Sequence, residues 1–242
     1  MGSEMCIRDS MDAVEEYIQD PSVKGMFCVP KYSNPTGITY SDEVVRRIAA
    51  MQPAASDFRV IWDNAYCVHD LVTDGDVLLN IFDLLPEYGN EDMVIEVAST
   101  SKITFPGAGI SCLVASEKNL NIIRQRLTVQ TISYDKMNMH RHVQFFGNAE
   151  GVREHMKKHA AILKPKFDIV LQHLDRELAG RGIASWYNPK GGYFISFDVM
   201  PGCAKRIGDL CKAAGVTLTT VGATYPYGVD PQDSNIRIAP TF

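Results

Sequence analysis

Lys102 is the residue of this sequence whose surroundings most clearly predict chemistry. It follows an apolar run at residues 93–98 and three hydroxyl residues, Ser99, Thr100 and Ser101, and it precedes a Pro-Gly-Ala-Gly turn. A lysine at the end of a buried strand can be partly desolvated, which lets its amine act as a nucleophile. Hydroxyls and free backbone N–H groups beside it suit a phosphate. The stretch predicts an amine nucleophile next to a phosphate site, with a plain surface lysine as the alternative.

An amine next to a phosphate site is what pyridoxal phosphate requires, because its aldehyde needs a lysine and its 5′-phosphate needs hydrogen-bond donors. Two further polar clusters follow apolar strands. Residues 34–37 (Asn-Pro-Thr-Gly) come after a strand predicted at 24–29, and residues 63–66 (Asp-Asn-Ala-Tyr) come after one predicted at 59–62. Ligands of open α/β sheets bind beyond the carboxyl ends of the strands. We therefore expect all three clusters to face one crevice.

The residue types in these clusters suggest individual roles. Asp63 ends an apolar strand, where an unpaired carboxylate is costly, and a pyridinium N–H is a suitable partner that keeps the cofactor ring an electron sink. Tyr66 and Asn34 are donors suited to the phenolate oxygen of the cofactor. Lys102 would form the Schiff base and then, once released by the substrate amine, move the α-proton. Alternative interpretations are a helix cap or turn residue for Asp63, a β-turn for Asn34 and Gly37, and simple packing for Tyr66.

At these residues the chain resembles the fold-type-I pyridoxal-phosphate enzymes of the class I aminotransferase family. The resemblance rests on the order and spacing of four motifs: residues 34–37, Asp63 with Tyr66, residues 99–102, and Arg237 in Asn-Ile-Arg-Ile. Residues 190–194 (Lys-Gly-Gly-Tyr-Phe) are similar to the start of a strand in the family's small domain. The sequence around Lys102 looks most like that of a bacterial subgroup of aspartate aminotransferase-like proteins.

The resemblance implies a function and a set of site residues. It implies transfer of an amino group between an α-amino acid, such as aspartate or glutamate, and a 2-oxo acid through a Lys102 Schiff base. It implies that Arg237 holds the substrate α-carboxylate as a bidentate fork, together with Asn34. The cofactor contacts that it implies are Asn34, Asp63, Tyr66, Ser99, Ser101 and Lys102. Two alternatives stay open: another fold-type-I lyase, or an aminotransferase-like cofactor-sensing domain of a transcriptional regulator.

Two departures from the family pattern stand out. The family usually carries a phosphate-binding arginine seven or eight residues after the lysine, where this chain has Gly109 and Ile110. Residues 1–10 resemble a translated cloning scar, and we expect a fragment that lacks the N-terminal part of the family's large domain and the extreme C-terminus. A polypeptide limited to this chain is therefore expected to bind the cofactor poorly or not at all, and to be inactive. The resemblance also implies a homodimer for the full-length protein.

Composition narrows the classes of function. The chain has 242 residues, 45% hydrophobic and 22% charged, with a formal net charge of -5. We expect no nucleic-acid partner, since no basic stripe stands out, and no membrane span, since no apolar run approaches ~20 residues. The six cysteines are scattered, which favours a reduced, cytoplasmic setting. His155 and His159 could share a helix face, but no acidic or cysteine ligand falls at zinc spacing beside them, so we expect no metal.

The periodicity of the sequence predicts an α/β fold. Strands and helices alternate over residues 11–137, which we interpret as a partial cofactor-binding large domain with a mostly parallel sheet and helices on both faces. A short helix is predicted at 78–85. Residues 138–242 are interpreted as a linking helix, at about 138–179, and a truncated small α+β domain. The strands predicted in that domain lie at 183–187, 193–199, 216–219 and 235–239.

Overall fold

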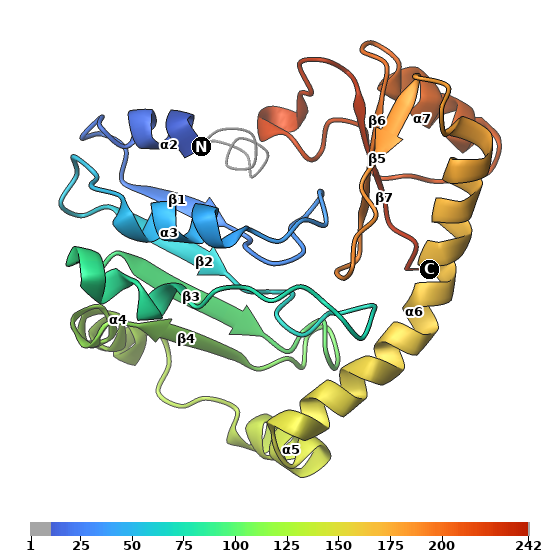
Figure 1. Ribbon diagram of the computed structural model, residues 1–242. Coiled ribbons are helices and arrows are strands. Elements are labelled where there is room, and N and C mark those ends of the chain that lie inside the picture. Colours follow the sequence, from blue (N-terminus) through green and yellow to red (C-terminus); the bar gives the residue numbers. More distant parts are fainter. Residues whose placement is uncertain (1–10, 242) are drawn as a thin grey trace.

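The computed structural model describes residues 11–241 of the chain. Over these residues it contains two β-sheets that are connected by a pair of helices (Figure 1). The segment interpreted as a cloning scar, residues 1–10, lies outside the described residues. The boundary predicted between the domains at 137 and 138 stays a prediction.

The first sheet has four strands in the order β1-β2-β3-β4. Strands β1 (Gly25–Cys28), β2 (Arg59–Asp63) and β3 (Val94–Ser99) run parallel, and β4 (Ser111–Ala115) pairs with β3 in the antiparallel direction. The antiparallel pair follows from the short connection between β3 and β4, because a parallel pair needs a long crossover. The predicted α/β class with a mostly parallel sheet is confirmed.

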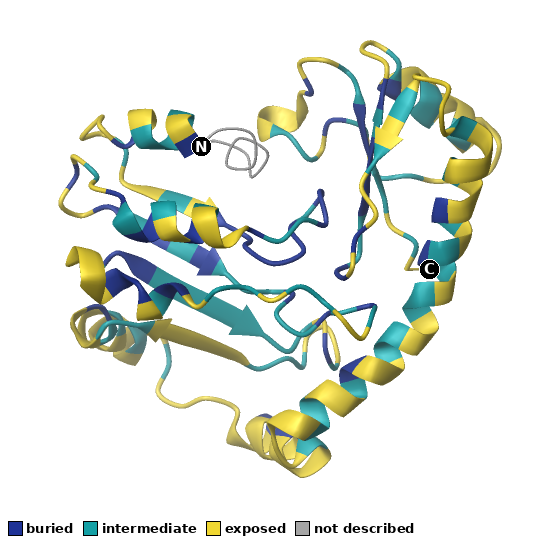
Figure 2. Ribbon diagram, viewed as in Figure 1, coloured by how far each residue is buried: buried dark blue, intermediate teal, exposed yellow. Residues whose placement is uncertain are grey.

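Two helices cover one face of this sheet. They are α2 (Met11–Tyr17) and α3 (Asp42–Ala50), and the Ser41 hydroxyl caps α3 by accepting from the Val44 N–H. Val45 and Ile48 of α3 pack on Val60 and Trp62, which alternate along β2 toward that face. Each fully buried aliphatic side chain of this kind contributes about 1.5–3 kcal/mol, so this cluster is the main core of the sheet. Figure 2 shows the contrast between buried β2 and exposed β4.

The connections around this sheet differ from the prediction in one place. The single short helix predicted at 78–85 is wrong, because the segment forms two 3₁₀ turns, η1 (Ile81–Asp83) and η2 (Leu85–Tyr88). Pro86 has no N–H and fits only the first turn of a helix, so a new turn begins after Leu84. Helix α4 (Glu117–Gln130) follows β4 and contacts it.

The helical region predicted at about 138–179 consists of two helices, α5 (Lys136–Phe146) and α6 (Ala149–Leu178). Gly147 ends α5 with a φ of 70°, a left-handed conformation that glycine adopts without strain. Asn148 then starts α6, and its Oδ1 accepts a hydrogen bond from the Gly151 N–H at 3.0 Å. Helix α6 runs from α5 along one side of the molecule to the second sheet (Figure 1).

The second sheet is antiparallel, in the order β5-β6-β7. Its strands are β5 (Ala184–Trp186), β6 (Ile195–Val199) and β7 (Asn235–Ile238), and α7 (Ala204–Ala213) and the 3₁₀ turn η3 (Pro226–Gly228) belong to the same part of the chain. The strand predicted at 216–219 is wrong. That segment lacks a ladder partner, and it packs Leu218 into the apolar cluster around Phe197 and Ile236 instead.

A backbone pairing joins the two halves of the molecule. Asp70 and Gly191 form an antiparallel bridge, with the Leu71 N–H donating to the Lys190 carbonyl at 2.8 Å. A Cβ at Gly191 would lie 2.1 Å from the ring of Tyr32, so only glycine permits this approach. The turn that precedes β6 is thereby fixed against the first sheet.

Candidate active site

The carboxyl ends of the three parallel strands bring the sequence-predicted clusters to one edge of the first sheet. Asn34 lies in the loop after β1, Asp63 ends β2, and Lys102 follows β3. Arg237, on β7 of the second sheet, reaches the same place, since its Nη1 donates to the Asn34 Oδ1 at 2.8 Å. Tyr66 is buried beside this edge.

Lys102 and Asp63 are electrostatically coupled. The Asp63 carboxyl is half-buried, and burial raises its pKa while the Lys102 ammonium opposes that rise. The Lys102 Nζ lies 4.9 Å from the centroid of the Tyr66 ring, a cation–π distance. Apart from this ring contact, Lys102 is an exposed residue, and its expected partial desolvation stays a prediction.

The guanidinium of Arg237 is held by three neighbours. Besides Asn34, the Thr219 Oγ1 accepts from Nη2 at 3.1 Å, and the Phe194 ring centroid lies 4.5 Å from the Cζ atom. A guanidinium carries five N–H donors, and these two hydrogen bonds use two of them. The Nε of Arg237 is buried without a hydrogen-bond partner among the described residues. The group can therefore still offer donors to a carboxylate.

Two serine hydroxyls lie together before Lys102. The Ser99 Oγ accepts from the Ser101 N–H at 3.1 Å, and the two hydroxyl oxygens are 3.0 Å apart. Gly109 lies against this turn, and a Cβ there would be 2.8 Å from the Ser101 backbone nitrogen. A side chain at position 109 would therefore require this turn to shift.

Four residues near these groups were not assigned roles from the sequence. Thr219 and Phe194 contact Arg237, and His69 and Tyr193 contact the Lys102 main chain. Tyr193 and Phe194 belong to the Lys-Gly-Gly-Tyr-Phe motif, so that motif could have drawn attention to them. For Thr219 and His69 the sequence offers no local signal, because their contacts depend on long-range packing.

The histidines of α5 and α6 contact the Lys102 loop. The His155 Nε2 donates to the Ile103 carbonyl at 3.0 Å, and the His142 Nε2 lies within 3.1 Å of the hydroxyls of Thr100 and Thr104. Within residues 11–241, no group of three or more His, Cys, Asp or Glu side chains is arranged to hold a metal ion. None of the helices in that range combines the length and apolar character needed to cross a bilayer.

Comparison with known proteins decides the family. The aspartate amino-transferase family profile matches residues 7–242. The chain is also 48% identical over 232 residues to an aspartate aminotransferase of Corynebacterium glutamicum, covering 96% of this chain and 54% of that protein. The chain belongs to the aspartate aminotransferase family. It spans about half the length of the curated relatives that it matches.

Solved structures agree with this family. An aspartate transaminase of Corynebacterium glutamicum superimposes with a TM-score of 0.93 at 47% identity, covering 96% of this chain and 55% of that one. An α-aminoadipate aminotransferase of Thermus thermophilus, solved as a complex with N-(5′-phosphopyridoxyl)-L-leucine, gives a TM-score of 0.74 at 22% identity, with 96% and 57% of the chains covered. The second likeness concerns the fold alone. The family as a whole implies pyridoxal phosphate as cofactor.

Proposed function

We propose that the protein carrying this chain is a pyridoxal-phosphate-dependent transaminase that acts on α-amino acids and 2-oxo acids, with aspartate or glutamate as the amino donor. The observation that supports this most strongly is the convergence of Asn34, Asp63, Lys102 and Arg237 at one edge of the sheet. The name of the relatives supports the choice of a dicarboxylic amino acid.

The residues of this edge fit the groups of pyridoxal phosphate. Lys102 supplies the amine for the aldehyde, and Asp63 supplies a half-buried carboxylate for a ring N–H. The Asn34 Oδ1 faces a guanidinium that can only donate, so its amide N–H groups are left for a phenolate oxygen. The Ser99 hydroxyl donates to the Ser101 oxygen, so Ser101 keeps its own O–H for a phosphate and Ser99 orients it. When bound, the cofactor supplies an electron sink for the electrons released at the substrate α-carbon.

Arg237 is the proposed anchor of the substrate. Its guanidinium keeps unused donors for the α-carboxylate, and Asn34 and Thr219 fix the plane of the fork. Lys102, as a free amine, would remove the proton from the α-carbon and return it on the cofactor side. Asp63, as a carboxylate, would hold the ring nitrogen in its protonated form through this step.

A half-reaction on the protein loaded with pyridoxal phosphate tests this function. Addition of aspartate should shift absorbance from about 430 nm to about 330 nm, with release of one equivalent of the 2-oxo acid per site. Lys102→Ala should show neither change, whereas Lys136→Ala, which removes an exposed lysine at the start of α5, should behave as wild type. Glutamate, alanine and aromatic amino acids, tested in parallel, define the side-chain preference.

The alternatives give different outcomes in the same experiment. A fold-type-I lyase would release carbon dioxide or a leaving group instead of a 2-oxo acid from the intact amino acid skeleton. A cofactor-sensing regulatory domain would bind the cofactor and leave the amino group on the donor. Either result would contradict transamination.

A further inference from the structure

We propose that His69 and Tyr193 are positioning residues for Lys102, which hold its main-chain carbonyl so that its side chain extends across the ring of Tyr66. The inference rests on the function proposed above, since it assigns these residues to the lysine of that site. The two side chains contact the Lys102 main chain and the Tyr66 ring, and neither of them is assigned a contact with the cofactor or the substrate.

Both residues donate to one oxygen. The Tyr193 hydroxyl donates to the Lys102 carbonyl at 2.9 Å, and the His69 Nε2 lies 3.3 Å from the same atom. A carbonyl oxygen has two lone pairs and only accepts, so both are used and the Nε2 of His69 carries the proton. With its carbonyl held from two directions, the peptide plane after Lys102 cannot rotate without breaking a hydrogen bond.

Burial keeps His69 in the neutral form, with a single ring N–H, that this role requires. His69 is 3% exposed, and burial lowers its pKa to about 4. The hydrogen bond to the Lys102 carbonyl and the Asp70 charge oppose this lowering of the pKa, whereas the Lys102 and His159 charges reinforce it. The ring is thus neutral near pH 7, with one N–H, and that N–H points to Lys102. Its Nδ1 is buried without a hydrogen-bond partner within the described residues.

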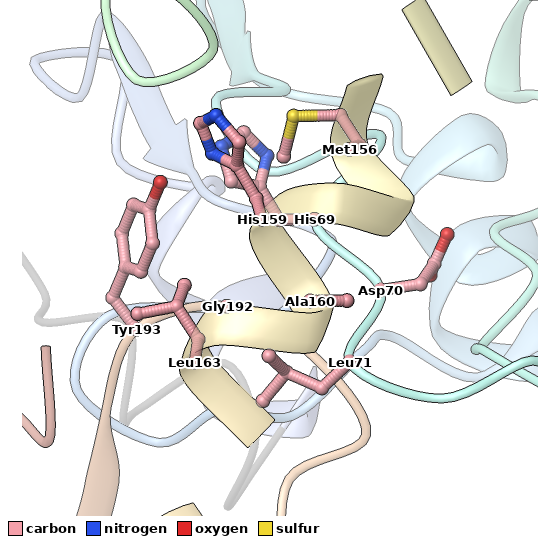
Figure 3. A pocket seen from close by; sticks show the side chains of 9 residues that line it. All are labelled: His69, Asp70, Leu71, Met156, His159, Ala160, Leu163, Gly192 and Tyr193. Carbon is pink, nitrogen blue, oxygen red and sulfur yellow. The ribbon is translucent and has the colours of Figure 1, made fainter. Parts of the chain in front are cut away.

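Tyr193 comes from the other half of the molecule. The Gly192 N–H donates to the His69 carbonyl at 2.9 Å, beside the bridge between Asp70 and Gly191. This pairing places Tyr193 next to His69 in space although 124 positions separate them (193 − 69). Figure 3 shows both side chains around a turn of α6, at a cavity of about 10 Å³ that His159 and Met156 also line.

Ring contacts link the main-chain anchor to the lysine side chain. Tyr66, His69 and Tyr193 meet edge to face, with centroid separations of 5.3 to 5.9 Å. The Lys102 Nζ lies over the Tyr66 ring. The same three rings therefore fix where the lysine backbone sits and which surface its ammonium faces. His155 and His142 contact other positions of the loop, Ile103 and the threonines, so they hold the loop without contacting Lys102.

Two chemical probes of Lys102 test the proposal. Acetic anhydride labels free amines without any cofactor. Pyridoxal phosphate followed by borohydride labels an amine that reaches the cofactor site. Peptide mapping then gives the labelling rate of Lys102 relative to that of Lys136. The variants are Tyr193→Phe, His69→Phe and His69→Gln. Tyr187→Phe is the matched control, since it removes a hydroxyl from the same sheet region that is not a donor to this carbonyl.

Removal of either donor should make acetylation of Lys102 faster by about threefold, because the ammonium loses its ring contact, and borohydride trapping slower by about fivefold. His69→Gln keeps an N–H donor and should recover most of both effects. Lys136 should react as in wild type, and so should Lys102 in Tyr187→Phe. If acetylation of all lysines became faster together, the substitutions would have loosened the fold as a whole, and this result would contradict a specific positioning role.

The outcomes separate the two proposals. Unchanged acetylation of Lys102 in both Phe variants would overturn the positioning role, whatever the cofactor does. Faster acetylation in the Phe variants, together with no specific trapping in the full-length wild-type protein, would retain the positioning role and contradict the proposed function.

Discussion

At the scale of single residues, the polar contacts of the candidate site orient its charged side chains more than they neutralise their charges. Arg237 lies between the amide oxygen of Asn34 and the hydroxyl of Thr219, over the ring of Phe194. None of these neighbours is a carboxylate, so the guanidinium keeps its charge available for an anion. Lys102 differs, because its ammonium lies over the Tyr66 ring and also interacts with the Asp63 carboxyl.

Thr219→Val should weaken substrate binding without disturbing the chemical step. Loss of one hydrogen bond to a charged group lets the Arg237 fork rotate, and we expect KM for the amino donor to rise about tenfold with kcat within about twofold. Thr219→Ser should restore KM. Thr220→Val, at the neighbouring exposed threonine, is the matched control. An equal effect of the two valine variants would contradict this use of Thr219.

His69 should make the fold sensitive to acid. In the unfolded chain an imidazole binds a proton below its ordinary pKa of 6.5, whereas folded His69 stays neutral until about pH 4. The free energy of unfolding should therefore fall between those pH values, by about 2–3 kcal/mol from this residue. Urea unfolding at pH 7 and pH 4.5 measures the loss. His69→Asn should remove the part of the acid-induced loss that comes from His69, whereas His173→Asn, at an exposed histidine, should leave the loss unchanged. Equal losses of free energy of unfolding in wild type and His69→Asn would contradict this role of His69.

At the scale of single elements, local sequence patterns were sufficient to predict the strands that carry the candidate site. Each apolar run that ends in a polar cluster became β1, β2 or β3, because an apolar strand buried in a parallel sheet leaves only its carboxyl end for polar chemistry. The segment at 216–219 is rich in β-branched residues yet forms no strand. Strand formation requires a partner edge, and composition alone does not specify one.

The start of α6 offers a test of this helix, which connects the two sheets. Asn148→Ala removes the acceptor for the Gly151 N–H and should lower the free energy of unfolding by about 1 kcal/mol. Asn148→Asp keeps an acceptor at the same position and should retain stability. Denaturant unfolding measures both. A full effect of the aspartate variant would show that the cap is not the cause.

At the scale of the whole molecule, contacts between the two halves of the chain complete the candidate site. Asn34 and Arg237 are 203 positions apart and form a hydrogen bond, and His69 and Tyr193 meet through the backbone pairing of Asp70 with Gly191. The family motifs predicted Asn34 and Arg237, since those motifs record a shared site. They could not predict Thr219 or His69, whose contacts arise only when the two halves pack.

Trapping of the cofactor on the full-length protein that carries this chain tests the central claim most directly. The protein is incubated with pyridoxal phosphate, reduced with borohydride, digested and mapped, a procedure that detects even weak binding because reduction makes the link permanent. The account predicts saturable labelling of Lys102 above every exposed lysine, and loss of this saturation in Asp63→Ala, where the carboxylate partner is gone. Labelling that follows lysine exposure alone, with no preference for Lys102 and no effect of Asp63→Ala, would contradict it.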